Sequence, residues 1–215
     1  MYTAVGTRPD IAYAVGMVSR YCTEPNATHL TAVKRIFRYL RGTSDLCLKY
    51  EKGNDEVVVG YSDADWAGDL NDRRSTTGNV FMQSGAAISW LSKKQAAVAL
   101  STSEAEYIAL SLAAQEITWL RKLLSEFGVK FDGPTTLMED NQGAIAIANN
   151  PVNHARTKHI DIRYHYIRQC ILEGIVKVHY CSTENMYADM FTKPLPKGKF
   201  EMLRSGIGLC HFRDI

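Results

Sequence analysis

The sequence predicts an α/β fold: a five-stranded mixed sheet flanked by helices and preceded by a helical N-terminal segment. Three apolar runs at 57–63, 79–83 and 86–91 follow one another with no helix between them, as antiparallel strands do. Two more strand-like runs, at 135–140 and 175–181, each follow a helical pattern. Strands joined by a helix pair in parallel, whereas strands joined by a tight turn pair antiparallel. The sheet is therefore expected to contain both kinds of pairing.

The N-terminal segment is expected to be helical. Pro9 near a first helical position and Asn26 as a cap predict two helix starts, because these residue types favour those positions. The second helix runs to Arg41 and ends at Gly42. Its basic side consists of Lys34, Arg35, Arg38 and Arg41. That side is either a solvated face or a face that contacts phosphate groups.

Four further helices are expected in the rest of the chain. The longest is amphipathic and ends at Gly128, since glycine commonly terminates helices. The expected ranges are 103–127, 142–149, 158–173 and 185–192.

Composition describes an ordinary soluble protein. The 215 residues carry a net charge of +2, which is too small to indicate a nucleic-acid-binding protein, so any basic surface must be local. The five cysteines lack CxxC spacing, which argues against a disulfide framework or a zinc site and favours a reducing compartment. The sequence has no evident signal peptide or membrane span. We therefore expect an intracellular, cytoplasmic protein.

Four acidic residues stand out by their positions in this pattern: Asp63, Glu106, Asp140 and Asp189. Asp63 ends one strand and Asp140 follows another, at the edge of an α/β sheet where ligands bind. Converging carboxylates repel one another unless cations neutralise them, and hard divalent cations prefer oxygen ligands. The matching chemistry is phosphodiester hydrolysis assisted by two metal ions.

Two glutamates compete for the helical position, because both fit the pattern in which a serine caps a helix and a glutamate three residues later reaches back. If Ser101 pairs with Glu104, Glu106 is free on the side of the helix that faces the sheet. If Ser103 pairs with Glu106, that glutamate serves the helix terminus instead. A free carboxylate on a packed face is costly to bury unless a cation compensates it, so the first register suits a metal ligand.

The other acids also have simpler interpretations. Asp65 ranks second to Asp63 as the strand-end carboxylate, because it lies past the apolar run. Asp140 is either a metal ligand or the N-cap of the following helix. Glu139 is expected to point away from the site if its strand alternates. Asp189, on a short terminal helix, is either a ligand or a solvated residue.

Six motifs follow in order along the chain. They are YSDADWAG at 61–68, SWLSKKQ at 89–95, AEYIAL at 105–110, DNQ at 140–142, KHID at 158–161 and ADMFTK at 188–193. Together they resemble the ribonuclease H domain of copia-type LTR retrotransposon Pol polyproteins, which implies a ribonuclease H-like fold. Residues 1–50 resemble the region that links the reverse transcriptase to that domain.

The resemblance also implies a division of the chain. Residues 1–52 are expected to be a helical segment from the thumb or connection end of the reverse transcriptase. Residues 53–195 are expected to form the ribonuclease H-like domain, and 196–215 a C-terminal tail.

The resemblance implies a function and a cofactor. Asp63, Glu106, Asp140 and Asp189 match the acids that hold two Mg²⁺ ions in ribonuclease H, with Mn²⁺ as a substitute. The implied reaction is endonucleolytic hydrolysis of the RNA strand of an RNA–DNA hybrid during retrotransposon reverse transcription. The implied partners are the hybrid and the reverse transcriptase portion of the same polyprotein, with no membrane, and the parent element would place them in a virus-like particle.

Six basic residues are candidates for contacts with the phosphates of the hybrid, although each could equally be an exposed solubilising charge. They are Arg73, Arg74, Lys93, Lys94, Arg156 and Lys158.

One departure from the family concerns histidine. Many relatives have a flexible loop with a histidine shortly before the last acid, but the corresponding segment 180–185 has none. His179 is the nearest, and His154, His159 and His165 are expected to be structural.

Two alternatives to the enzyme remain. A truncated, catalytically silent retrotransposon remnant would only bind nucleic acid or a polymerase partner. Another nuclease or a transposase of the same fold is less favoured, because those proteins pair strand acids with a late glutamate, whereas this chain has aspartate last.

Overall fold

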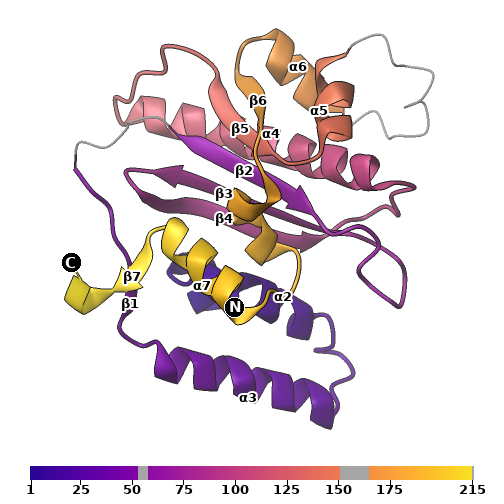
Figure 1. The fold of residues 1–215 in the computed structure, drawn as a ribbon, viewed down its shortest axis with the longest axis vertical. Coiled ribbons are helices and arrows are strands. Elements are labelled where there is room, and N and C mark those ends of the chain that lie inside the picture. Colours follow the sequence, from indigo (N-terminus) through magenta and orange to yellow (C-terminus); the bar gives the residue numbers. More distant parts are fainter. Residues whose placement is uncertain (53–57, 151–164, 215) are drawn as a thin grey trace.

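The computed structural model describes residues 1–52, 58–150 and 165–214. Its central feature is a five-stranded sheet in the order β4-β3-β2-β5-β6 (Figure 1). The strands are β2 (Val59–Ala64), β3 (Thr76–Gln83), β4 (Ala86–Lys94), β5 (Thr135–Glu139) and β6 (Val176–Tyr180). Pairs β2/β3 and β3/β4 are antiparallel, whereas β2/β5 and β5/β6 are parallel. The predicted five-stranded mixed sheet is confirmed.

Three helices cover one face of the sheet: α4 (Thr102–Glu126), α5 (Gln142–Asn149) and α6 (Tyr166–Leu172). The apolar side chains between them and the sheet form the larger core, in which Phe81, Ile108, Leu137 and Ile167 are almost fully buried. Helix α4 supplies many of these side chains because its apolar residues recur at helical spacing.

The opposite face is covered by the C-terminal elements and by part of the N-terminal segment. Val80 and Phe81 are neighbours in β3, yet they belong to different apolar clusters, because side chains alternate across a strand. The cluster around Val80 includes side chains from η5 (Tyr187–Phe191), α7 (Lys197–Gly206) and α2 (Ala12–Ser19). Figure 1 shows α2 and α7 together on this side.

The N-terminal segment comprises α1 (Tyr2–Gly6), η1 (Pro9–Ile11), α2, α3 (Ala27–Gly42) and β1 (Leu46–Leu48). Asn26 caps α3 as predicted, since its side chain accepts a hydrogen bond from the N–H of His29 at 3.0 Å. The Trp90 indole donates to the Ala4 carbonyl at 2.7 Å, which ties α1 to β4. Strand β1 pairs antiparallel with β7 (Leu209–His211), so the last element of the N-terminal segment joins the C-terminal segment in a second, two-stranded sheet.

Several elements differ from the sequence prediction. Strand β3 begins at Thr76 and β4 extends to Lys94, and both are therefore longer than expected. The segment 196–215, expected only as a tail, contains α7 and β7, with Leu203 and Ile207 buried at helical spacing. The expected helix 158–173 lies partly outside the described residues, and the last short helix is the 3-10 segment η5.

No helix in the described ranges is both long enough and apolar enough to cross a lipid bilayer.

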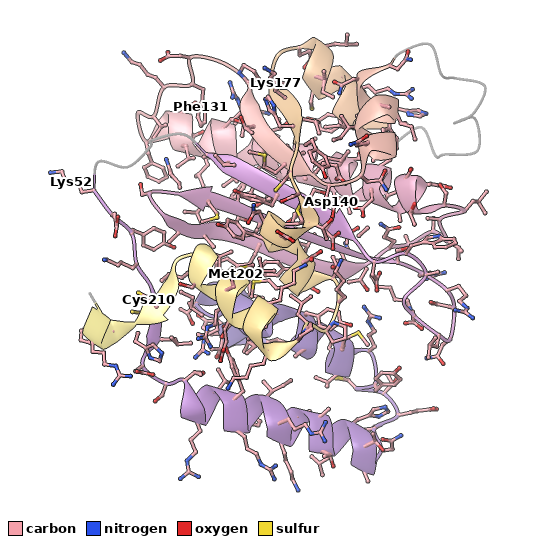
Figure 2. The ribbon with its side chains drawn as sticks, in the orientation of Figure 1. Lys52, Phe131, Asp140, Lys177, Met202 and Cys210 are labelled. Carbon is pink, nitrogen blue, oxygen red and sulfur yellow. The ribbon has the colours of Figure 1, made fainter. Side chains whose placement is uncertain are left out.

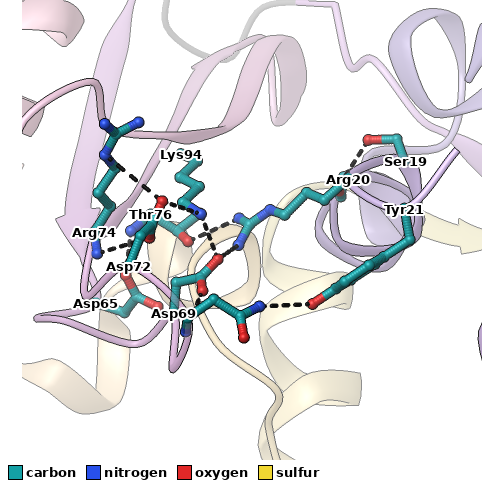
Figure 3. A network of polar contacts seen from close by, with 11 residues as sticks. Ser19, Arg20, Tyr21, Asp65, Asp69, Asp72, Arg74, Thr76 and Lys94 are labelled. Carbon is teal, nitrogen blue, oxygen red and sulfur yellow. Dashed lines mark hydrogen bonds and ion pairs between the residues drawn. The ribbon is translucent and has the colours of Figure 1, made fainter. Parts of the chain in front are cut away.

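A polar network ties α2 to the loop that follows β2 (Figure 3). Asp69 accepts from Arg20 at 3.1 Å and from Lys94 at 2.5 Å. Arg20 also donates to the Thr76 hydroxyl at 3.1 Å, and Lys94 forms a second ion pair with Asp72 at 2.7 Å. The network joins the N-terminal segment, the loop and β4, and it holds the loop next to the end of the strand that carries the candidate site.

Asp69→Asn is expected to lower the free energy of unfolding by about 2 kcal/mol, because it weakens hydrogen bonds between charged groups. The hydrogen bond from Lys94 lowers the pKa of Asp69 to about 2. Because the pKa of Asp69 in the folded protein lies below its ordinary value of 3.8, the ionised side chain stabilises the fold at any pH above 3.8. That contribution is lost as the pH falls from 3.8 towards 2. Urea unfolding at neutral and acidic pH measures both effects.

The matched control is Asp72→Asn, which removes a carboxylate that is 37% exposed and also pairs with Lys94. It is expected to cost clearly less than Asp69→Asn, because exposed ion pairs contribute little to stability. An equal effect of the two substitutions would contradict the structural role given to Asp69.

Candidate metal centre

Three of the four predicted acids converge. Asp63, Glu106 and Asp140 each offer one carboxylate oxygen, and these three atoms lie within 4.8 Å of one another. Asp63 comes from the end of β2, Asp140 directly follows β5, and these two strands are parallel neighbours. Their carboxyl ends therefore lie at one edge of the sheet, where Figure 2 labels Asp140. Glu106 reaches the same edge from the N-terminal part of α4.

The start of α4 explains why Glu106 is available. Ser101 is the N-cap and accepts a hydrogen bond from the N–H of Glu104 at 3.2 Å. The Glu104 carboxylate in turn accepts from the N–H of Leu100 at 2.9 Å. The first of the two predicted capping registers is thus confirmed. Glu106 accepts from the backbone N–H of Ala64, and its buried Oε2 has no hydrogen-bond partner among the described residues.

Asp140 does not serve as a helix cap. Asn141 occupies the N-cap position of α5, and its side chain accepts from the N–H of Ala144 at 2.9 Å. The Thr183 hydroxyl donates to Asp140 Oδ2 at 2.7 Å, which fixes the orientation of that carboxylate. The capping alternative is therefore wrong for Asp140.

Asp65, the second choice for the strand-end acid, has a different place. Its carboxylate accepts a hydrogen bond from the backbone N–H of Thr76, across the start of the β2–β3 ladder. Among the described residues, the converging group consists of Asp63, Glu106 and Asp140 without Asp65. The contact to Thr76 gives Asp65 a role in holding the strand ends together.

Asp189 lies beside this group but is held by lysines. Its side chain is fully buried, so the solvated interpretation is wrong. Lys193 Nζ lies 2.6 Å from Asp189 Oδ1 and 3.6 Å from Asp63 Oδ2, so it stands between the two carboxylates. Lys199 pairs with the other oxygen of Asp189. The Thr192 hydroxyl donates to Asp63 Oδ2.

Burial disfavours charge on these acids. It raises the pKa of Asp63 to about 6, with Lys193 opposing the rise and Asp189 adding to it. Burial also raises the pKa of Glu106 well above its usual value, and the charges of Glu139 and Asp63 raise it further. Carboxylates in this arrangement hold protons more readily unless a cation compensates their charge.

Glu139 is a member of the site's surroundings that sequence reasoning missed. It was expected to point away, but it is fully buried, and burial together with the charges of Asp63 and Asp140 raises its pKa well above its usual value. It shares the α4-facing side of β5 with the core residue Leu137, two positions earlier. The two-residue spacing from the buried Leu137 is the sequence feature that predicts a buried Glu139. Its Oε1 accepts from the N–H of Asn141 at 3.0 Å, and its buried Oε2 has no hydrogen-bond partner among the described residues.

Two of the predicted phosphate-binding residues are engaged with acids. Lys94 pairs with Asp69 and Asp72, so its ammonium group is already neutralised within the loop network. Arg74 lies 3.6 Å from Asp72 and is exposed.

Of the other four predicted phosphate-binding residues, two lie in the described part of the chain and two do not. Arg73 and Lys93 are exposed, and Arg73 adopts a positive φ of 58°. Arg156 and Lys158 lie outside the described residues. A role of these side chains in binding nucleic acid stays a prediction.

The described histidines do not supply an obvious proton carrier. His165 Nδ1 lies 2.9 Å from the Tyr107 hydroxyl, which supports its predicted structural role. His179 lies partly buried in β6. His154 and His159 fall outside the described residues.

The donor set fits a hard divalent cation. Carboxylate oxygens of Asp63, Glu106 and Asp140 lie close together. Glu106 also has a buried oxygen, Oε2, that has no hydrogen-bond partner in the described part of the chain. Oxygen ligands of this kind suit Mg²⁺, Mn²⁺ or Ca²⁺ rather than a soft metal. The site can therefore hold at least one such ion.

Comparisons with known proteins give extensive matches. The chain is 49% identical over 209 residues to the "Retrovirus-related Pol polyprotein from transposon TNT 1-94" of Nicotiana tabacum, which covers 97% of this chain and 16% of that protein. It is 43% identical over 203 residues to the "Retrovirus-related Pol polyprotein from transposon RE1" of Arabidopsis thaliana, covering 94% of this chain and 14% of that protein. The chain thus spans about a sixth or less of the length of these relatives.

A shorter relative is the "Secreted RxLR effector protein 161" of Plasmopara viticola, 52% identical over 120 residues, or 56% of this chain and 84% of that protein. Among solved structures, an N-terminal RNase H domain from Mycobacterium tuberculosis matches with a TM-score of 0.43 and 12% identity. That match covers 69% of this chain and 96% of the solved chain. No family model matches the chain.

Proposed function

Because this chain belongs to the Pol polyproteins of copia-type retrotransposons, we propose that it corresponds to their ribonuclease H region and cleaves the RNA strand of RNA–DNA hybrids endonucleolytically. The observation that carries the proposal is the convergence of Asp63, Glu106 and Asp140 at the carboxyl edge of β2 and β5. Cleavage of this kind would serve reverse transcription of the parent element.

The proposed cofactor is a pair of Mg²⁺ ions, for which Mn²⁺ can substitute. Asp63, Glu106 and Asp140 supply oxygen ligands, and Asp189 joins them beside Asp63. Two such ions supply activation of a water and stabilisation of the leaving 3′ oxygen. Thr183 and Thr192 orient the carboxylates of Asp140 and Asp63 through their hydroxyl groups.

Recognition of the hybrid would depend on its shape and on its 2′-hydroxyl groups, because proteins read A-form helices mainly in this way. The exposed Arg73 and Lys93 are the candidates for phosphate contacts in the described part of the chain that are not engaged in the loop network. Their positive charges would contribute affinity that falls as the salt concentration rises.

The proposed protein partner is the reverse transcriptase portion of the same polyprotein. The N-terminal segment exposes large apolar side chains, with Tyr2 96% and Phe37 66% exposed. Apolar side chains of this size favour burial against another protein surface. The proposed place of action is the cytoplasm, within the virus-like particle of the parent element.

A cleavage assay tests the proposal. With Mg²⁺, the protein is expected to cut labelled RNA annealed to DNA, and not the same RNA annealed to RNA. EDTA is expected to abolish cleavage, and excess Mg²⁺ to restore it, because the acids need a divalent cation to act. Equal cutting of both duplexes, or no cutting of the hybrid by folded protein, would overturn the proposal. Binding without cutting would favour the silent remnant.

A further inference from the structure

We propose that Lys193 is a counter-cation built into the site, which competes with the second divalent ion for Asp63 and Asp189 and makes that ion the weaker bound of the two. This inference rests on the two-ion site of the proposed function. It assigns to Lys193 a role in setting metal occupancy, as a positioning residue and not as a metal ligand.

The position of Lys193 supports this role. Its ammonium group lies 2.6 Å from Asp189 Oδ1 and 3.6 Å from Asp63 Oδ2, where it balances both negative charges. The Asp189 side chain is fully buried and that of Asp63 is 2% exposed, so solvent screens these charges poorly. Removal of the lysine would leave two buried carboxylates facing each other.

Lys199 completes the neutralisation of the half of the site that contains Asp63 and Asp189. It pairs with the second oxygen of Asp189 and also donates to the Thr183 carbonyl at 3.0 Å. The two lysines therefore offset the two negative charges of Asp63 and Asp189. Both lysines come from the segment that follows Asp189, so one stretch of chain supplies the acid and its counter-charges.

The other half of the site lacks such direct ion pairs, and the charge of Lys193 reaches Asp140 only at longer range. Within the described ranges, neither Glu106 nor Asp140 forms an ion pair with a lysine or arginine, and Glu139 adds a further acid nearby. An incoming divalent ion is therefore expected to bind first among Asp63, Glu106 and Asp140. A second ion at Asp63 and Asp189 must first displace an ammonium group, which weakens its binding.

Lys193 is able to make way for an ion. Its side chain is 37% exposed, and it lies at the end of a flexible four-carbon stem. Lys199 makes an additional backbone contact, which holds it more firmly in place. Lys193 is therefore the lysine expected to move when the second ion binds.

Isothermal titration of the full chain with Mn²⁺ in the absence of nucleic acid tests the proposal. Wild-type protein is expected to bind one ion at least about tenfold more tightly than the second. Lys193→Met is expected to tighten the second binding step by about tenfold or more, because the competing charge is gone. In EDTA the same variant is expected to melt at a lower temperature than wild type, and Mn²⁺ should restore its melting temperature.

Two further variants serve as controls. Lys193→Arg keeps the charge and is expected to reproduce the wild-type titration. Lys197→Met removes a largely exposed lysine of the same segment, which is 3.9 Å from Glu201, and is expected to leave metal binding unchanged.

Several outcomes would overturn the proposal. They are two ions bound by wild type with equal affinity, identical titrations of wild type and Lys193→Met, or loss of the second ion in a folded Lys193→Met protein. The wild-type titration alone can overturn the proposal, even if the variant does not fold. Since no nucleic acid is present, failure of hybrid cleavage would refute the proposed function without affecting this result.

Discussion

Replacing Glu106 with glutamine is expected to reduce cleavage of an RNA–DNA hybrid on the order of a thousandfold, equivalent to about 4 kcal/mol of activation free energy. Glutamine keeps the size of the side chain but removes the negative charge that a divalent cation needs. The fold should not suffer, because burial already raises the pKa of Glu106 well above its usual value. In EDTA, the variant is expected to be at least as stable as wild type. Cleavage rates and thermal melting measure the two effects.

Glu104→Gln is the matched control on the same helix. Glu104 serves the start of α4 through the N–H of Leu100, and glutamine can make the same contact. This variant is expected to keep near wild-type activity. Equal losses of activity in both variants, or a Glu106→Gln protein that cleaves normally, would contradict the role given to Glu106.

Removal of divalent cations is expected to make stability depend on pH in an unusual direction. Burial raises the pKa of Asp63 to about 6, whereas unfolded aspartate titrates near 3.8. Above about pH 6 the folded protein carries the cost of a charged, buried carboxylate, and that cost is relieved as the pH falls towards 4. The difference corresponds to about 3 kcal/mol, or on the order of 6–12 °C in melting temperature for a chain of this size.

Thermal melting between pH 7 and pH 5, with EDTA and with Mg²⁺, measures this effect. In EDTA the melting temperature is expected to rise as the pH is lowered, and at pH 7 added Mg²⁺ is expected to raise it, because the ion replaces the proton as the compensating charge. The stabilisation by Mg²⁺ should shrink at lower pH. In Asp63→Asn, the part of the pH dependence due to this residue should disappear. A melting temperature in EDTA that falls steadily as the pH is lowered from 7 to 5 would contradict the account.

Much of the sheet and the converging acids could be predicted from local patterns. The polar break after β2 places Asp63 at the strand end, and the serine cap at Ser101 separates the structural Glu104 from the available Glu106. Asn141 caps α5, which leaves Asp140 to the site. Both residue types cap helices well, so the sequence left this choice open. These are contacts between residues close in sequence, and local chemistry decides them.

Other features depend on contacts between distant residues, which a single sequence does not reveal. The pairing of Lys193 and Lys199 with Asp189 requires the turn of η5 and α7, whose positions come from packing on the sheet. The link from Arg20 to Asp69 joins residues 49 positions apart. The prediction for Glu139 failed for another reason, since its strand alternates as expected but the buried side was assigned wrongly.

The most direct test of the central claim is an anomalous difference map from a crystal of this protein grown with Mn²⁺. The account predicts a peak bounded by the carboxylates of Asp63, Glu106 and Asp140, and a weaker peak towards Asp189. A map without a peak among those three carboxylates, or with Mn²⁺ bound only elsewhere on the protein, would contradict it.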